Sequence, residues 1–409
     1  TRALAALAAS FPVFFLIIAR GGGLSTGATA LLATALGRGD RRTARLLALQ
    51  GLGLGLAVSL ALSVLGPRLA PFLFRALGAA GPYLDACLAY MNPILRSAPL
   101  FLIPHMANAA LIARGDTRSF RNILMVGCVL NVGLDPWFIF GGLGLPALGL
   151  PGIAWATVLT QALACLYLGR RLLASGLVDA PAAREFIPCL RTWGQIMHQG
   201  IPAAVNMFTV GLGIFVITRY FSLYGPEATA AYGIATRIEQ IALMPSLGLG
   251  AAVLTLVAQN RGAGRPDRVR QSLRCALGCG AAITLPAALG ILLLAGPLMG
   301  LFSDDPAVAA AGTGYLRVAA LAQYAYVLLY LCVSAMQGLQ RPLFAVWLGL
   351  ARQVALPVLL FELFTRVLGL GLPAIWWGIA GIVWAAALFA AAWVRRALGR
   401  LLPPEGEPT

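Results

Sequence analysis

The sequence predicts an all-α polytopic membrane protein built from two pseudo-symmetric six-helix bundles, and three observations predict it. Of the 409 residues, 60% are hydrophobic and only 11% are charged, whereas a soluble domain carries roughly 25% charged residues. The apolar residues form runs that are long enough to cross a bilayer. The two halves of the chain also repeat one another at a nearly constant offset. Together these observations disfavour a soluble fold.

Eleven apolar runs are candidates for membrane-spanning helices. About 20 apolar residues are needed for each, because backbone groups in lipid must be hydrogen-bonded within their own segment. Glycines at 21–23 and 27 would allow the first run to bend. The predicted spans are 3–36, 46–66, 86–113, 122–142, 149–169, 196–223, 228–259, 275–302, 308–338, 343–365 and 374–394.

The basic residues predict the orientation in the membrane. All 30 of them are arginine, and they give the chain a formal net charge of +16. One alternating set of connections, together with the 170–193 segment and the tail, holds 20 arginines. The other set holds only Arg68, Arg75 and Arg366, with Arg2 at the start. By the positive-inside rule we expect the C-terminus to be cytoplasmic, and the charge then reflects topology rather than nucleic-acid binding.

An internal repeat organises the chain. Gly37-Arg38-Gly39 recurs as Gly262-Ala263-Gly264 at an offset of 225 residues, and Tyr90 recurs as Tyr315. The run at 196–223 has no counterpart in the first half. We therefore expect a chain that lacks its first helix, and a removed signal peptide is the alternative. The predicted parts are an N-terminal lobe of five helices (1–175), a cytoplasmic linker (176–193), a C-terminal lobe of six helices (194–402) and a cytoplasmic tail (403–409).

Two acidic residues stand well inside apolar runs, where an ionisable group is by default a functional candidate. Asp135 follows Asn131 by one helical turn, and Pro136 next to it would leave the carbonyl of Val132 free to accept from a proton or an ion. The alternative for this pair is a purely structural hydrogen bond to neighbouring helices. Glu239 is a candidate for substrate or proton binding, and a buried bond between helices is its alternative.

Other charged or polar residues carry weaker indications. Glu362 lies near the end of its run and is expected at the membrane interface. Arg20 and Arg96 are either counter-charges to acidic groups in the membrane or side chains that extend to the membrane interface, and the sequence leaves both open. Ser25 and His105 would have to converge in an intramembrane enzyme, but the GLSTG motif at 23–27 lies in an apolar helix rather than the strand–turn–helix that a nucleophile elbow requires. We read that motif as a source of helix flexibility.

Several classes of protein are disfavoured. The chain has no Walker A loop, so this chain alone is not an ATP-driven pump. The seven cysteines show no C-x-x-C spacing, and neither His105 nor His198 has the spacing of a metal ligand. We expect no enzymatic activity, no cofactor and no metal apart from a coupling sodium ion.

Four stretches resemble the multidrug and toxic compound extrusion (MATE) family. They are ATALGRGDRRTA at 33–44, GDTRSFRNILMVGCVLNVGLDPWFIFG at 115–141, LGLPGIAWATVLTQ at 148–161, and the segment at 232–271 that begins YGIATRIEQ. The resemblance covers residues 10 to about 400. It implies two six-helix lobes arranged in a V, alternating access, and export of amphipathic, often cationic compounds driven by inward flow of protons or sodium ions.

The resemblance also implies roles for individual residues. Asn131 and Asp135 match the N-x-x-x-D motif of the family's fifth helix, which binds the proton or sodium ion in members coupled through the N-terminal lobe. Thr157 is similar to the hydroxyl that joins this site from the sixth helix. The branch resembling NorM instead uses acids on the seventh and tenth helices, and the runs 196–223 and 308–338 contain none. Coupling through Asp135 is therefore expected, and Glu239 remains unassigned.

The resemblance thus implies a secondary active multidrug antiporter in a bacterial inner membrane. Its expected partners are small organic molecules and membrane lipid, with no nucleic acid, and we expect a monomer. A lipid-linked precursor flippase of the same superfamily is the alternative. Such a flippase would need basic residues for a pyrophosphate, and Arg20, Arg96 and Arg352 are the candidates.

Overall fold

The computed structural model describes residues 2–142, 144, 146–178, 185 and 187–401. These residues form helices joined by short loops, with no β-strand among them, and fall into two compact units that divide between Ala204 and Val205. The predicted tail at 403–409 and residues 179–184 and 186 of the predicted linker lie outside the described residues. The predicted all-α fold class is confirmed.

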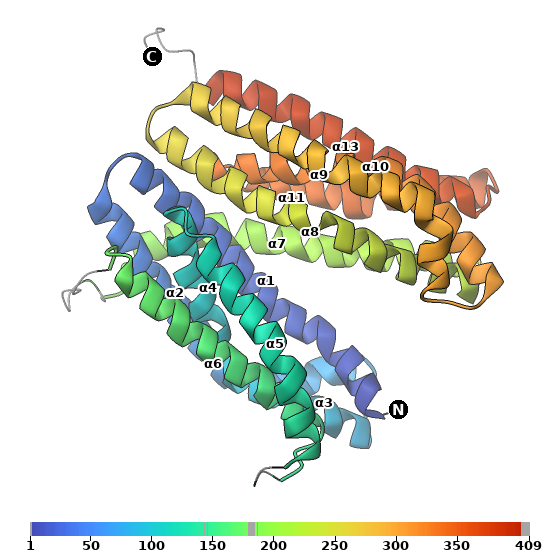
Figure 1. Cartoon of the computed structure of the whole chain (residues 1–409), viewed down its shortest axis with the longest axis horizontal. Helices are drawn as coiled ribbons and strands as arrows, with labels where there is room; N and C mark the ends of the chain where they lie inside the picture. The colour runs from blue at the N-terminus through green and yellow to red at the C-terminus, as the bar shows by residue number, and fades with distance from the viewer. Residues whose placement is uncertain (1, 143, 145, 179–184, 186, 402–409) are drawn as a thin grey trace. The chain divides into compact units, whose positions relative to one another are not determined.

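The first unit contains six helices and the beginning of a seventh. They are α1 (Arg2–Gly37), α2 (Arg41–Ala76), α3 (Gly81–Arg96), α4 (Ala98–Ala113), α5 (Arg118–Phe140), α6 (Leu150–Ala174) and the part of α7 (Leu190–Ser222) that precedes Val205 (Figure 1). A core of apolar side chains, among them Phe74, Met91 and Leu102, joins α2, α3, α4 and α6. By contrast α5 packs mainly on α6, and Ser119 is its one buried residue.

The second unit contains the rest of α7 and the remaining helices. They are α8 (Pro226–Gly262), α9 (Pro266–Gly300), α10 (Pro306–Gly338), α11 (Leu343–Leu350), the π-helical turn η2 (Ala351–Ala355), α12 (Leu356–Glu362), a second π-helical turn η3 (Leu363–Val367) and α13 (Leu372–Leu401). Helix α10 packs on α8, α9 and α13, and it is the most enclosed helix of this unit among the described residues. The core around it includes Phe221, Leu316 and Phe361.

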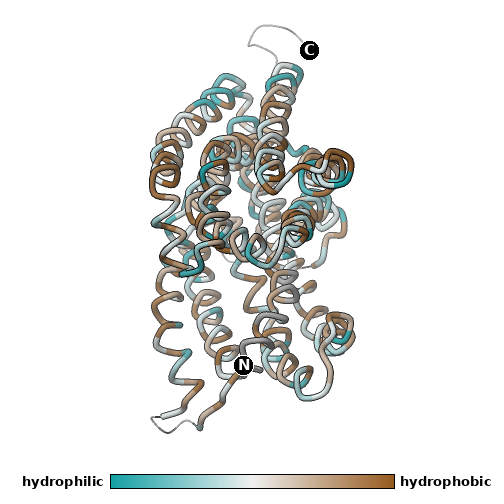
Figure 2. The backbone as a smooth tube through the Cα atoms, turned by 90° about the vertical axis from the view of Figure 1, so that its right-hand side faces the viewer, coloured by the Kyte–Doolittle hydropathy of each residue, from teal (hydrophilic) through white to brown (hydrophobic). Residues whose placement is uncertain are grey.

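Membrane-crossing length is a property of most of these helices. Among the described residues, nine helices are long and apolar enough to cross a membrane, and the bent pair α3–α4 makes a tenth candidate. Figure 2 shows apolar residues along the lengths of the helices. The predicted run at 86–113 is therefore not one straight helix, because the chain bends by 47° where α3 gives way to α4. Pro99 in the first turn of α4 cannot donate to the preceding turn, which accounts for the break.

The internal repeat is visible in the order of the elements. Helices α2, α3 and α5 begin 225 residues before α9, α10 and α11. The loops after α1 and α8 end their helices in the same way, since Gly39 has φ +76° and Gly264 has φ +67°. Glycine is required there because this left-handed conformation strains other residues.

The glycines of α1 allow close packing against neighbouring segments. Helix α1 runs unbroken from Arg2 to Gly37. A Cβ atom added at Gly23 would lie 2.5 Å from the Cβ of Ala204, and one added at Gly27 would lie 2.5 Å from the backbone nitrogen of Gly200. These positions let α1 and the start of α7 touch along their backbones.

Candidate functional site

The predicted coupling residues lie on α5, which is fastened to α6 at both ends. At the C-terminal end of α5, the N–H of Leu148 donates to the carbonyl of Phe138 over 3.0 Å, and the N–H of Gly149 donates to that of Ile139 over 3.2 Å. Gly152 on α6 lies so close that a Cβ atom there would be 2.5 Å from the Phe138 oxygen. The chain therefore holds the start of α6 against the end of α5.

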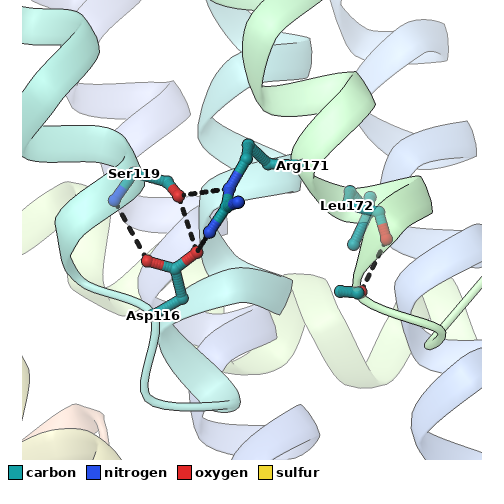
Figure 3. Close-up of polar contacts among 5 residues, drawn as sticks. Asp116, Ser119, Arg171 and Leu172 are labelled. Atoms are coloured by element: carbon teal, nitrogen blue, oxygen red, sulfur yellow. Dashed lines mark hydrogen bonds and ion pairs between the residues drawn. The ribbon is translucent and has the colours of Figure 1, made fainter.

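At the other end of α5, a charged cluster performs the same task. Arg171 of α6 donates from Nε to the Ser119 hydroxyl over 2.9 Å and pairs with the Asp116 carboxylate at 3.2 Å (Figure 3). Asp116 also accepts from the hydroxyl and the backbone N–H of Ser119. Partial burial raises the pKa of Asp116, but the Ser119 hydrogen bonds and Arg171 together lower that pKa below its ordinary value.

Asp135 and Asn131 lie between these two fastenings. In both residues Oδ1 is enclosed by protein and has no hydrogen-bond partner among the described residues. Burying such oxygens without a partner is costly, and a cation or a proton would relieve that cost. The phenol of Tyr90, on α3, is close enough to Asp135 to interact with it electrostatically. The two oxygens are therefore available as ligands for a proton or a cation.

Thr157 stands on α6, the helix against which α5 packs. Its hydroxyl donates to the carbonyl of Ile153 over 3.0 Å, which leaves the lone pairs of the oxygen available. Within the described part of the chain, no hydrogen bond joins Thr157 to Asn131 or Asp135. A carboxylate, an amide oxygen and a hydroxyl are suitable ligands for sodium, so the chemistry of the three residues fits the predicted ion.

Glu239 occupies a second polar site, inside the second unit. The side chain is 6% exposed, and Oε2 accepts a hydrogen bond from the Tyr315 hydroxyl over 3.1 Å. The rings of Tyr232 and Tyr315 meet edge to face at 5.5 Å beside the carboxylate. Sequence reasoning missed both tyrosines as partners. Tyr232 lies seven residues before Glu239, two turns back on the same face, and this spacing was the available signal.

Arg352 is also buried in this unit, on the π-helical turn η2. Its guanidinium lies 5.6 Å from the centre of the Tyr326 ring. Arg20 and Arg96, the other two candidates for binding a pyrophosphate, are exposed on the first unit. Of the three, only Arg352 is enclosed by its own unit.

The remaining candidates have ordinary partners. Glu362 accepts from the Tyr220 hydroxyl over 3.1 Å and pairs with Arg366 at 2.7 Å. Ser25 and His105 do meet, but the Ser25 hydroxyl donates to the backbone carbonyl of His105 over 2.9 Å and not to its ring. That contact is structural, and it does not form the pair of nucleophile and base that an enzyme would need.

The sequence of the chain is similar to a known protein family and to individual bacterial proteins. A family model described as MatE matches residues 1–137 and 202–360. The "FAD transporter" of Shewanella oneidensis is 30% identical over 356 residues, which cover 87% of this chain and 79% of that protein. The "Probable multidrug resistance protein NorM" of Pseudomonas aeruginosa is 29% identical over 393 residues, covering 91% of this chain and 78% of the relative.

Solved structures resemble the whole chain. A crystal structure described as MATE in the straight conformation has a TM-score of 0.91 at 24% identity, covering 98% of this chain and 89% of the other. A transporter of the MOP superfamily from Pyrococcus furiosus, described as having a binding pocket of reversed polarity, has a TM-score of 0.90 with the same identity and coverage. Both have the fold of this chain.

Proposed function

The chain belongs to the MATE family of membrane transporters, and on that premise we propose that it exports amphipathic organic compounds in exchange for protons or sodium ions. It is an integral membrane protein, and relatives named as multidrug resistance proteins support multidrug efflux. The relative named as an FAD transporter supports a substrate range that includes anionic compounds.

The observation that carries the coupling proposal is the pair of unpartnered oxygens on Asn131 and Asp135. A carboxylate in the membrane is costly while it is charged and bare, so it gains from taking up a proton or a sodium ion. The neutralised carboxylate then changes the packing of α5 against α6, and a ligand that binds only one of the two packings shifts their populations. The hydroxyl of Thr157 completes the proposed set of ligands.

Glu239 is the proposed substrate or proton site of the second unit. Its carboxylate is enclosed, and the Tyr315 hydroxyl fixes its direction. The lipid-linked precursor flippase is the less favoured function, because relatives named as multidrug resistance proteins support efflux.

The test is gradient-driven efflux of a fluorescent organic cation from proteoliposomes, with proton and sodium gradients applied separately. We expect Asp135→Asn to reduce efflux to the rate of protein-free liposomes while the protein stays folded. The reason is that the amide can neither bind a proton nor offer a negative charge to a sodium ion. Asn131→Ala and Thr157→Ala should weaken efflux less, by about tenfold, as loss of a supporting ligand does. Asp85→Asn, an exposed acid on α3, is the matched control. Unchanged efflux by Asp135→Asn at equal membrane abundance would leave the pair a structural role only.

A further inference from the structure

Arg352 is a buried cation that the protein does not neutralise by direct contact. It is 8% exposed, on the turn η2 of the second unit. Within the described ranges, no hydrogen bond and no ion pair within 4.0 Å reaches its guanidinium. Other arginines of the chain do pair directly, Arg171 with Asp116 and Arg366 with Glu362. Arginine carries five N–H donors in a rigid fork, and here none of them is used.

The nearby carboxylate does not fill this role. Glu239 attracts Arg352 electrostatically, but it lies beyond ion-pair distance and its Oε2 is occupied by the Tyr315 hydroxyl. The guanidinium instead lies over the face of Tyr326. That contact leaves the plane of donors free to bind an oxyanion.

The backbone places Arg352 in this position by an irregularity in the helix. The π-helical turn Ala351–Ala355 precedes Pro357, which has no N–H to donate to the carbonyl of Gln353. Both Arg352 and Gln353 are buried on that turn. Single π-helical turns occur often at functional sites, because they redirect side chains that a regular helix would turn away.

Helix α10, which carries Tyr326, also carries a buried polar side chain that has no hydrogen-bond partner among the described residues. Gln323 is 0% exposed, and neither its Oε1 nor its Nε2 has a hydrogen-bond partner in the described part of the protein. It stands one helical turn before Tyr326, the residue whose ring carries Arg352. A buried amide that is wholly unpaired is costly, as is an unpaired buried arginine, so α10 and η2 each carry a buried polar group that a ligand could satisfy.

We propose that Arg352 is the anion-binding residue of the second unit and takes the carboxylate or phosphate group of an aromatic substrate. The oxyanion receives two parallel hydrogen bonds from the guanidinium, which the ring of Tyr326 supports from one side. This inference rests on the proposed export function and gives it a substrate class: amphipathic compounds that combine a ring system with an acidic group. The phosphate of a lipid headgroup has the same chemistry, and the experiment separates the two sources.

The test is equilibrium binding without any ion gradient. The full chain is placed in nanodiscs of phosphatidylcholine, and flavin fluorescence reports binding of flavin mononucleotide and of riboflavin, which differ only in the phosphate. We expect Arg352→Gln to weaken flavin mononucleotide binding by roughly tenfold or more and to leave riboflavin unchanged. Arg352→Lys should fall between, since it keeps the charge but loses the fork. Arg317→Gln, an exposed arginine on α10, is the matched control and should change neither.

Two outcomes would overturn the proposal. One is an equal effect of Arg352→Gln on both flavins, which would mean a general loss of structure. The other is unchanged flavin mononucleotide binding together with loss of phosphatidylglycerol that co-purifies with the wild type, which would assign the site to a lipid headgroup instead of a substrate. This assay measures binding without an ion gradient and the coupling test measures gradient-driven efflux, so failure of the coupling proposal is distinguishable from failure of this one.

Discussion

Asp116 makes a pH-dependent contribution to stability at the level of a single residue. Its pKa is lower in the folded protein than its ordinary value of 3.8, so its contribution is fully present above that value and is lost as the pH falls through the lower folded value. Asp116→Asn should lower the stability at neutral pH by about 1 kcal/mol or less, because Arg171 is half exposed and solvent screens the pair. Thermal unfolding in detergent between pH 7 and pH 3 checks this. The gap between wild type and variant should close below about pH 4, and a gap that widens in acid would contradict it.

Individual site residues were predictable from sequence to different degrees. Asp135 and Asn131 could be nominated from the sequence, because a carboxylate and an amide one turn apart in an apolar run are visible without knowledge of their neighbours; their coupling role stays a prediction. The hydrogen bond from Tyr315 to Glu239 and the contact of Arg352 with Tyr326 were not found. Those contacts depend on which faces of separate helices meet, and apolar runs without a polar stripe do not encode that.

At the scale of elements, the contact between α5 and α6 depends on Gly152. A Cβ atom there would lie 2.5 Å from the backbone oxygen of Phe138, and backbone cannot yield as a flexible side chain can. Gly152→Ala should therefore destabilise the protein by about 1–3 kcal/mol. Gly169→Ala on the same helix is the matched control, because nothing lies within 4 Å of its added Cβ. It should be neutral or stabilising by roughly 0.5–1 kcal/mol, and equal unfolding temperatures for the two variants would refute the close contact.

Helix existence was well predicted, while helix irregularity was not. Hydropathy alone located the long helices of both units. Backbone N–H and C=O groups in lipid must form hydrogen bonds within the protein, and the helix is one of the few structures that allow this. The bend between α3 and α4 and the π-helical turns η2 and η3 were missed. Prolines mark several of these places, but a proline in a membrane helix is compatible with a continuous helix, as Pro136 within α5 shows.

At the scale of the whole molecule, the repeat and the arginine distribution predict which loops share a side of the membrane. In a variant without native cysteines, Arg38→Cys and Ala263→Cys occupy corresponding positions in the loops after α1 and α8. Both should be protected from a membrane-impermeant maleimide in intact cells, whereas Ala80→Cys and Asp304→Cys should react. Permeabilised cells provide the control, since all four should then react. Different labelling of Arg38→Cys and Ala263→Cys in intact cells would refute the parallel repeat.

Helix α7 belongs to both compact units, since Leu190–Ala204 fall in the first and the rest in the second. The segment just before it is also held by the first unit, because the amide of Gln50 on α2 donates to the carbonyls of Glu185 and Ile187 and accepts from the N–H of Cys189. A gene divided between α6 and α7 would therefore yield two fragments, of which the second carries a helix that completes the first. The boundary between the two units lies within α7, so a gene split or fusion at that boundary would interrupt the helix. In this chain the boundary between the two units therefore falls inside α7, so an exchange of one unit between relatives would keep this helix whole only if the crossover lay outside it.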